Sequence, residues 1–259
     1  NYLINTLKSI NNQKNILLNN TLVILVINNS IDSNQSIKNN NESTNQLIKL
    51  YKFNFEYVIL DYYSSGYELP NKKAGVGVAR KIGMDYCLEY STKDSLLFCL
   101  DADTLISKKY LSQIIQCYNK KDFNTCIVKF LHQKSSNPKT EKAIRLYEKI
   151  LYTIADKIKK SKSPYGYVSL GSTMICNVNS YIACGGMPIK KATEDFYFLQ
   201  ALSKYTDIKI IDDILVYPSS RAETRVYLGT GFRISEYCKN KKNLSCFEIS
   251  LRIFLCRVL

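Results

Sequence analysis

Short apolar runs alternate with helical patterns along most of the chain, and this alternation limits the fold more than any other feature. Runs without a polar break predict strands buried in a sheet, and apolar residues three or four positions apart predict helices that pack on it. Such alternation is typical of an α/β domain with a mostly parallel sheet flanked by helices on both faces. The predicted strands span 21–27, 57–60, 96–100, 125–131, 168–177 and 208–217. The predicted helices span 2–10, 46–52, 76–90, 108–118, 141–160, 193–204 and 236–259, and a polar loop covers 34–45.

The chain has 36 lysines and arginines against 22 acidic residues, which gives a formal net charge of +14. A surface of this sign favours polyanions, whether nucleic acid, acidic lipid headgroups or phosphorylated substrates. The basic residues are spread along the sequence rather than clustered with aromatic residues, which argues against a nucleic-acid-binding module. With 46% hydrophobic residues the chain can bury a substantial core, so a disordered or fibrous protein is excluded.

Nine cysteines are scattered along the chain, and none forms a Cys-x-x-Cys pair. An odd number of cysteines without regular spacing is typical of a reducing compartment, so we expect the protein in the cytoplasm. No signal peptide and no apolar run of membrane-spanning length is visible in the sequence. No segment rich in Pro, Gly or Ser divides the chain, which predicts a single domain.

Two aspartates, Asp101 and Asp103, follow the apolar strand predicted over 96–100. In an extended backbone the i, i+2 spacing places both side chains on one side of the chain. Ligands of open α/β sheets bind at the carboxyl ends of the strands. Two carboxylates at such a place can hold a hard divalent cation and leave positions open for phosphate oxygens. The alternative is a simple turn, because Asp is common in turns.

Gly75, Gly77 and Arg80 stand at the predicted start of the helix over 76–90. The free N–H groups and the dipole of a helix start favour anions, and Arg80 adds a positive charge. Arg80 stands where a dinucleotide-binding fingerprint has its third glycine, so that motif is excluded. The alternative is that the two glycines only ease a loop into a helix.

Glu194 and Asp195 follow Thr193 at the start of another predicted helix. A carboxylate at this place is suited to act as a general base on an acceptor hydroxyl. The preceding Gly185-Gly186 turn lets the backbone pass close to a ligand. The alternative is capping, because Thr is a good N-cap and acidic residues in the first turn suit the helix dipole.

Arg221, Arg225 and Arg233 surround the segment Gly229-Thr230-Gly231. Guanidinium groups suit phosphate oxygens and glycines allow close approach, whereas a solvated basic loop is the alternative. The single histidine, His132, is predicted to be a polar surface residue rather than a metal ligand.

In their order along the chain these segments resemble the inverting family 2 glycosyltransferases of the GT-A fold. The segment Asn28-Asn29-Ser30-Ile31-Asp32 looks like the end of the family's Val-Asp-x-Gly-Ser-x-Asp nucleotide loop. The segment 73–83 is similar to its Gly-x-x-x-Ala-Arg-Asn-x-Gly helix start, and Asp101-Ala102-Asp103 matches its Asp-x-Asp metal motif. Gly185-Gly186 followed by Thr193-Glu194-Asp195 matches the Gly-Gly…Glu-Asp acceptor segment. The resemblance spans nearly the whole chain, and the ordered set is more specific than any one motif.

The resemblance implies a GT-A-like, Rossmann-like nucleotide-binding sheet in a catalytic domain over 1–235, followed by a C-terminal helical segment over 236–259. The family's first strand is expected before Tyr2 and is missing from the sequence. The implied reaction is a metal-dependent, inverting transfer of a hexosyl or N-acetylhexosaminyl group from a nucleoside-diphosphate sugar, with UDP favoured. The implied acceptor is a hydroxyl on a glycan, a lipid-linked molecule or another acceptor. The implied cofactor is Mn²⁺ or Mg²⁺, bridging the donor phosphates.

The resemblance also assigns roles to individual residues. Catalysis falls to Asp195 as the base with Glu194 beside it, and metal binding falls to Asp101 and Asp103. The residues expected to bind the donor are Asn28, Ser30, Asp32, Gly75, Arg80, Asp101, Ala102, Arg221 and Arg225. The residues expected to bind the acceptor are Gly185, Gly186 and Glu194.

The chain departs from the family pattern at three places. Ile27 replaces the first Asp of the nucleotide loop, Lys81 stands where Asn is usual, and no histidine follows the Glu-Asp pair. The alternative functions are a sugar-nucleotidyl transferase, which shares a similar sheet and metal, and a basic nucleic-acid-binding module. The segment 236–259 carries an apolar face with Arg252 and Arg257 nearby. It is expected either to pack on the domain or to lie on an anionic membrane surface, at the inner face of the membrane.

Overall fold

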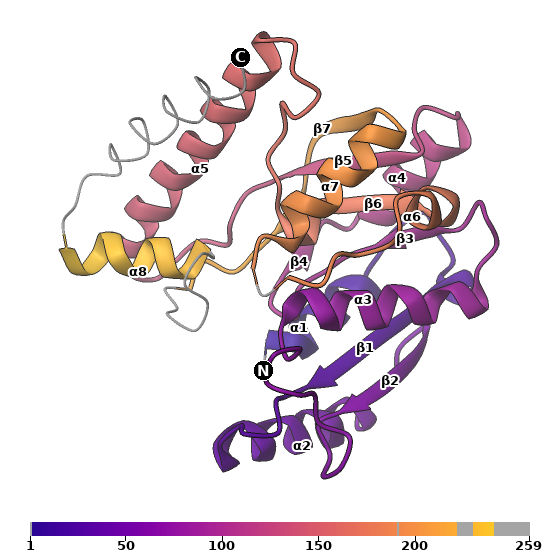
Figure 1. Ribbon diagram of the computed structural model, residues 1–259, viewed down its shortest axis with the longest axis vertical. Coiled ribbons are helices and arrows are strands. Elements are labelled where there is room, and N and C mark those ends of the chain that lie inside the picture. The colour runs from indigo at the N-terminus through magenta and orange to yellow at the C-terminus, as the bar shows by residue number, and fades with distance from the viewer. Residues whose placement is uncertain (1, 191, 222–229, 241–259) are drawn as a thin grey trace.

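The computed structural model describes residues 2–190, 192–221 and 230–240, which form two sheets surrounded by helices (Figure 1). The first sheet is the parallel pair of β1 (Leu22–Asn28) and β2 (Glu56–Tyr62). The second sheet has the order β3-β6-β5-β7-β4. Its strands are β3 (Leu96–Phe98), β4 (Leu105–Ile106), β5 (Thr125–Phe130), β6 (Met174–Asn177) and β7 (Ile208–Tyr217). The predicted α/β class is confirmed.

The strand directions differ from the mostly parallel sheet that the sequence predicts. β5 and β7 run parallel, but β6 is antiparallel to both β3 and β5, and β4 is antiparallel to β7. The second sheet is therefore mixed. The reason is connectivity, because β6 follows the long helix α5 (Pro138–Lys160) and enters the sheet between β3 and β5 from the opposite end. The direction of a strand depends on this return path and not on its local apolar pattern.

Helix α3 (Val76–Cys87) contacts both sheets. Gly83 of α3 faces Val26 of β1, and the Sγ of Cys99, just after β3, donates to the Sδ of Met84 at 3.5 Å. The other helices are α1 (Tyr2–Asn11), α2 (Gln35–Lys49), α4 (Tyr110–Asn119), α6 (Val178–Ala183), α7 (Glu194–Tyr205) and α8 (Thr230–Asn240). Short 3-10 turns are η1 (Leu18–Asn20), η2 (Leu88–Tyr90) and η3 (Gly171–Thr173).

The loop predicted over 34–45 is wrong, because helix α2 begins at Gln35. The side-chain oxygen of Asn34 accepts a hydrogen bond from the N–H of Ile37 at 3.0 Å, which is a good N-cap. On the inner face Ile48 is fully buried, and the side-chain amide of Asn41 donates to Oδ1 of Asn29 at 2.9 Å. These tertiary contacts override the weak helix propensity of Asn and Ser.

Most of the other predicted elements are confirmed. These are the helices over 2–10, 76–90, 108–118, 141–160 and 193–204 and the strands over 21–27, 57–60, 125–131 and 208–217. The strand predicted over 168–177 is shorter, because a 3-10 turn precedes β6. Of the helix predicted over 236–259, the described residues contain only the end of α8, and 241–259 lie outside them. Among the described helices, none combines the length and the apolar character needed to cross a bilayer.

His132 is not the surface residue that the sequence predicts, because it is 1% exposed. Its Nδ1 lies 2.8 Å from Oε1 of Glu148, and that oxygen also accepts from the backbone N–H of His132 at 2.6 Å. Arg145 donates to both oxygens of Glu148 at 2.8 and 2.9 Å and to Glu141 at 2.8 Å. We call His132, Glu141, Arg145 and Glu148 the Arg145 cluster. It joins the end of β5 to α5, so burial of the histidine follows from a contact that local pattern does not reveal.

Candidate active site

The segment after β3 is a turn rather than a continued strand. The N–H of Thr104 donates to the carbonyl oxygen of Asp101 at 3.0 Å, which closes a turn over Asp101-Ala102-Asp103. The extended backbone expected from the i, i+2 spacing is therefore wrong, and the carboxylates of Asp101 and Asp103 meet two different arginines.

Two distant segments hold this turn through its backbone carbonyl groups. The hydroxyl of Thr6, in α1, donates to the carbonyl oxygen of Ala102 at 3.0 Å. The side-chain amide of Gln133, just beyond β5, donates to the carbonyl oxygen of Asp103 at 2.9 Å. The position of the turn is thus fixed by tertiary hydrogen bonds from both sides.

An ionic cluster, in which the side chain of Asp101 is 37% exposed, joins this turn to helices α3 and α7. The guanidinium of Arg80, in α3, donates through one terminal nitrogen to Asp101 and through the other to Glu194. The side chain of Arg80 is 11% exposed and that of Glu194 is 4% exposed. We call Arg80, Asp101 and Glu194 the Arg80 cluster. Three residues that the sequence places in three separate motifs therefore lie in direct contact.

Ser172 and Gly171, in the 3-10 turn before β6, complete the surroundings of this cluster. The hydroxyl of Ser172 donates to Oδ2 of Asp101 at 2.7 Å and accepts from the N–H of Asp101 at 3.1 Å. Gly171 lies directly against the guanidinium of Arg80, and a Cβ at this position would overlap it. Sequence reasoning missed both residues. The available signal was the glycine that interrupts the apolar run over 168–177.

Helix α7 begins directly after a residue in the left-handed region. Thr193 has φ 62° and ψ 18°, and its hydroxyl donates to the carbonyl oxygen of Ala192 at 2.6 Å instead of capping the helix. The capping role considered for Thr193 is therefore wrong. A β-branched residue is strained in this region, so neighbouring contacts must hold it. The chain on either side packs closely on α3, where a Cβ at Gly77 would lie 2.5 Å from the carbonyl oxygen of Lys190 and 3.2 Å from the Cβ of Glu194.

Burial and charge act in opposite directions on the ionisable groups. Burial raises the pKa of Glu194 and the pKa of Asp195 above their ordinary values, and the charge of Arg80 offsets only part of this. Burial acts to lower the pKa of Arg80, but the charges of Asp101 and Glu194 outweigh it, so the guanidinium stays protonated. Three carboxylates near one guanidinium leave an excess of negative charge. Carboxylates with raised pKa values in such a cluster are typical of active sites.

Asp195 and Glu194 point in different directions, because adjacent helical residues are about 100° apart. The carboxylate of Glu194 is turned to Arg80 and is buried. Asp195 is half-buried, and its Oδ1 accepts from the N–H of Phe196 at 2.8 Å. The roles expected for them at the acceptor stay predictions.

Asp103 forms an ion pair with Arg221, which lies just after the end of β7. The guanidinium carbon of Arg221 also lies 4.3 Å from the centroid of the Tyr2 ring. An arginine predicted to bind the donor therefore reaches the Asp-x-Asp turn from far along the sequence. Arg225 and Gly229 lie outside the described residues.

The other predicted donor residues lie at the end of β1 and before α3. Asn28 ends β1, Ser30 forms an isolated parallel bridge with Leu69, and Asp32 is exposed. Gly75 directly precedes α3. Within the described part of the chain, no hydrogen bond joins these four residues to the Arg80 cluster. Their contacts with a donor stay predictions.

Gly185 and Gly186 end helix α6. Both have positive φ, 83° and 77°, which suits glycine after a helix. The N–H of Gly185 donates to the carbonyl oxygen of Ile182 at 3.0 Å, and that of Gly186 donates to Tyr181 at 2.9 Å. Helix termination accounts for both glycines, and their contact with an acceptor stays a prediction.

The Asp-x-Asp turn fits a divalent cation that takes some of its ligands from a phosphate. In the described ranges, no three or more His, Cys, Asp or Glu residues gather into a group that could hold a metal ion by itself. Mg²⁺ beside substrate phosphates needs only one or two carboxylates. Both oxygens of Asp101 are engaged, by Arg80 and by Ser172. Among the described residues only Oδ2 of Asp103 is paired, with Arg221, so Asp103 is the carboxylate best placed to bind the ion.

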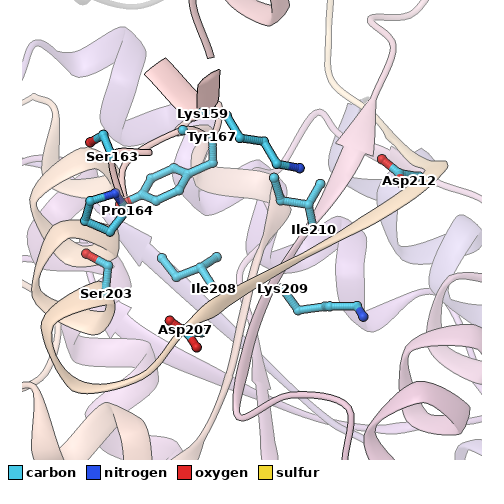
Figure 2. A pocket seen from close by; sticks show the side chains of 11 residues that line it. Lys159, Ser163, Pro164, Tyr167, Ser203, Asp207, Ile208, Lys209, Ile210 and Asp212 are labelled. Carbon is cyan, nitrogen blue, oxygen red and sulfur yellow. The ribbon is translucent and has the colours of Figure 1, made fainter. Parts of the chain in front are cut away.

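A separate cavity of about 450 Å³ lies between the ends of α5 and α7 and the start of β7 (Figure 2). Tyr167, Ser203 and Lys209 are among its lining residues, and none of the residues that line it belongs to the Arg80 cluster. It sits at the amino end of β7, whereas ligands of α/β sheets bind at the carboxyl ends of strands. Arg221, which meets Asp103, follows the carboxyl end of β7. We therefore place the candidate active site at the Arg80 cluster and the turn beside it.

Comparison with solved structures shows what this fold is similar to. The crystal structure of S. aureus TarS 1-349 in complex with UDP-GlcNAc matches with 15% sequence identity and a TM-score of 0.56, covering 88% of this chain and 57% of that chain. The crystal structure of S. aureus TarS 1-349 matches with 16% identity and a TM-score of 0.52, covering 94% and 70%. The chain spans only 34% of the longer TarS structure. No family model and no curated protein matches the chain. At this identity the likeness shows only that the chain shares the fold of TarS.

Proposed function

We propose that this chain is a metal-dependent inverting glycosyltransferase that uses a nucleoside-diphosphate sugar, with UDP favoured. The observation that carries the proposal is the Arg80 cluster, in which one arginine binds both the Asp-x-Asp turn and the Glu-Asp pair. TarS, which shares the fold, has been crystallised in complex with UDP-GlcNAc and in complex with UDP, and this supports the choice of donor. The transferred group is hexosyl or N-acetylhexosaminyl, and the acceptor is a hydroxyl on a glycan or a lipid-linked molecule.

In the proposed reaction Asp195 accepts the proton of the acceptor hydroxyl. The acceptor oxygen forms a bond to the anomeric carbon while the bond from that carbon to the diphosphate oxygen breaks. The nucleoside diphosphate leaves with that electron pair, and attack from the opposite side inverts the anomeric centre. The raised pKa of Asp195 supports this assignment, because a base works best when its pKa approaches the working pH.

Asp103 and Arg221 serve the donor phosphates in this proposal. Asp103 holds Mn²⁺ or Mg²⁺, and Asp101 stays nearby, held by Arg80 and Ser172. When bound, the ion offsets the negative charge of the leaving diphosphate. Arg221 already meets Asp103, so its guanidinium is placed to pair with a phosphate at the same turn.

The test is a thermal-shift and calorimetry panel of nucleoside diphosphates with and without MnCl₂. We expect UDP to raise the Tm only when Mn²⁺ is present, because a ligand that binds the folded state stabilises it. Release of UDP from a panel of UDP-sugars then identifies the sugar.

The same panel separates the alternative functions. A sugar-nucleotidyl transferase would instead respond to a nucleoside triphosphate and release pyrophosphate from it. A nucleic-acid-binding module would bind oligonucleotides with an affinity that falls steeply with salt. Either result, without a response to UDP, would overturn the proposal.

A further inference from the structure

We infer that Arg80 is a positioning residue that fixes the Asp-x-Asp turn relative to the catalytic carboxylate, rather than a ligand of the donor phosphates. The inference rests on the proposed function and changes the role that the sequence suggests. The helix start at Gly75 predicts that Arg80 faces an anion of the substrate. In the structure its anionic partners are Asp101 and Glu194 of the same chain.

The guanidinium of Arg80 is paired on two sides with carboxylates of the protein itself. Each of its terminal nitrogens meets a carboxylate, Asp101 on one side and Glu194 on the other. Its Nε is buried and, within the described residues, has no hydrogen-bond partner. A phosphate oxygen would have to compete with both carboxylates for the terminal nitrogens. In contrast, Arg221 lies on the exposed side of the turn.

The space around the guanidinium is too narrow for it to move freely. Gly171 packs against it so closely that a Cβ would overlap both terminal nitrogens. Gly77, on the preceding turn of α3, packs against the side chain of Glu194, where a Cβ would lie 3.2 Å from the Cβ of Glu194. A planar guanidinium held in this way fixes the two carboxylates relative to each other, which a flexible ammonium does not do.

Arg80 acts on Asp195 through Glu194, the first residue of α7. The strained backbone of Thr193 directly before it needs support from outside the helix. The Arg80–Glu194 ion pair gives that support where the helix begins. A catalytic group displaced by even 1 Å loses much of its effect. Through Asp101, the same guanidinium fixes the turn that carries Asp103.

Arg80→Lys tests the role, because it keeps the charge but replaces the fork by one ammonium that does not bridge both carboxylates. We expect the affinity for UDP with MnCl₂, measured by calorimetry, to fall about 10-fold or more. The matched control is Arg145→Lys, the same change in the Arg145 cluster. It is expected to lower the Tm but to keep the UDP affinity within about 2-fold, because the two sites are independent. All measurements are made well below the lowest Tm, so that every variant is folded.

A double-mutant cycle separates positioning from a general loss of stability. Glu194→Gln is expected to weaken UDP binding in the wild-type chain and to have no further effect in Arg80→Lys, because the two residues act as one unit. Gly171→Ala displaces the guanidinium without removing its charge, and it is expected to weaken UDP binding as Arg80→Lys does. Its matched control is Gly83→Ala, also a glycine close to a neighbouring side chain, at Val26.

Three results would overturn this inference, and they are distinguishable. If the wild-type chain does not bind UDP with MnCl₂, the proposed function fails and the positioning role fails with it. If the wild-type chain binds UDP and Arg80→Lys binds it equally well, the positioning role alone fails. If Arg80→Lys loses UDP affinity but the effects of Arg80→Lys and Glu194→Gln are additive, Arg80 is a ligand of the donor phosphates, as the sequence suggests.

Discussion

The Arg145 cluster and the Arg80 cluster each pair an arginine with a buried glutamate, but they connect different amounts of the chain. In the Arg145 cluster, Arg145 binds Glu141 and Glu148 one turn away on the same helix, and His132 comes from the neighbouring strand end. In the Arg80 cluster, each of the three residues comes from a different part of the fold. The first cluster therefore ties one helix to one strand, and the second brings three motifs to one place.

The pKa of the buried glutamate is shifted in opposite directions in the two clusters. Burial acts to raise the pKa of Glu148, but hydrogen bonds from His132 and Arg145 outweigh it and lower the pKa, so the ionised carboxylate stabilises the fold. Burial raises the pKa of Glu194 despite the charge of Arg80. Ionisation of Glu194 therefore lowers the free energy of unfolding at neutral pH. This difference supports the proposal that the Arg145 cluster serves structure and the Arg80 cluster serves chemistry.

The largest effect is expected from Asp195→Asn, which removes the proposed base next to the Arg80 cluster. The rate of UDP release from the donor should fall roughly 10²–10⁴-fold, while UDP affinity stays unchanged, because a base matters only in the transition state. The wild-type rate should also fall when the pH is lowered, because Asp195 is then protonated. Its pKa lies above the ordinary value of 3.8, so this loss begins at a higher pH than for an ordinary aspartate. Glu148→Gln is the control and should keep the wild-type rate. A full-rate Asp195→Asn enzyme would remove the base assignment.

The next effect is expected from Asp103→Ala, which removes the carboxylate best placed to hold the ion. Metal-dependent affinity for UDP should fall about 10-fold or more, and the Tm should change little because the side chain is partly exposed. Calorimetry of UDP with MnCl₂ measures the change. The control is Asp94→Ala, which removes an exposed carboxylate elsewhere. Equal UDP affinity in Asp103→Ala and wild type would show that this carboxylate does not hold the ion.

The sequence predicted those parts of the fold that local pattern determines. Apolar residues that repeat every three or four positions predict the helices α3, α4 and α5. Unbroken apolar runs predict the strands β1, β5 and β7 in the same way. The antiparallel direction of β6 and the burial of His132 depend on partners far along the chain, so no local pattern reveals them. Only the end of helix α2 was predicted, because the Asn-rich first part has weak helix propensity and its stability comes from packing.

The candidate site was predictable in its members but not in their arrangement. Asp101, Arg80 and Glu194 were each singled out by their spacing or by their place at a helix start. Their direct contact depends on how α3 and α7 pack against the turn, and this geometry changes the expected role of Arg80. Ser172 carries no motif, so only the structure identifies it as a partner of Asp101.

A smaller effect, on stability alone, is expected from Glu148→Gln. Removing this buried charge leaves Arg145 and His132 with a weaker partner, which should lower the free energy of unfolding by roughly 3 kcal/mol. The Tm should fall by about 6–12 °C, while the rate of UDP release per folded molecule stays unchanged. Thermal unfolding and a rate assay below the lowest Tm measure both. A matching loss of rate in the folded variant would show that the Arg145 cluster is not purely structural.

The smallest effect is expected from Glu194→Gln on stability, and its sign separates the two clusters. The folded-state pKa of Glu194 lies above the ordinary value of 4.5, so its ionisation opposes folding at neutral pH. Removing that charge should leave the Tm at pH 7 unchanged or slightly higher. As the pH falls through the raised pKa the carboxylate is protonated, and below about 4.5 the gain should vanish.

Glu148 has a lowered pKa, so its contribution is present above 4.5 and is lost as the pH falls below that value. The Tm differences of Glu194→Gln and Glu148→Gln from wild type should therefore shrink from opposite sides as the solution is acidified. A fall in Tm of Glu194→Gln at pH 7 as large as that of Glu148→Gln would mean that both clusters stabilise the fold, and the contrast between them would not hold.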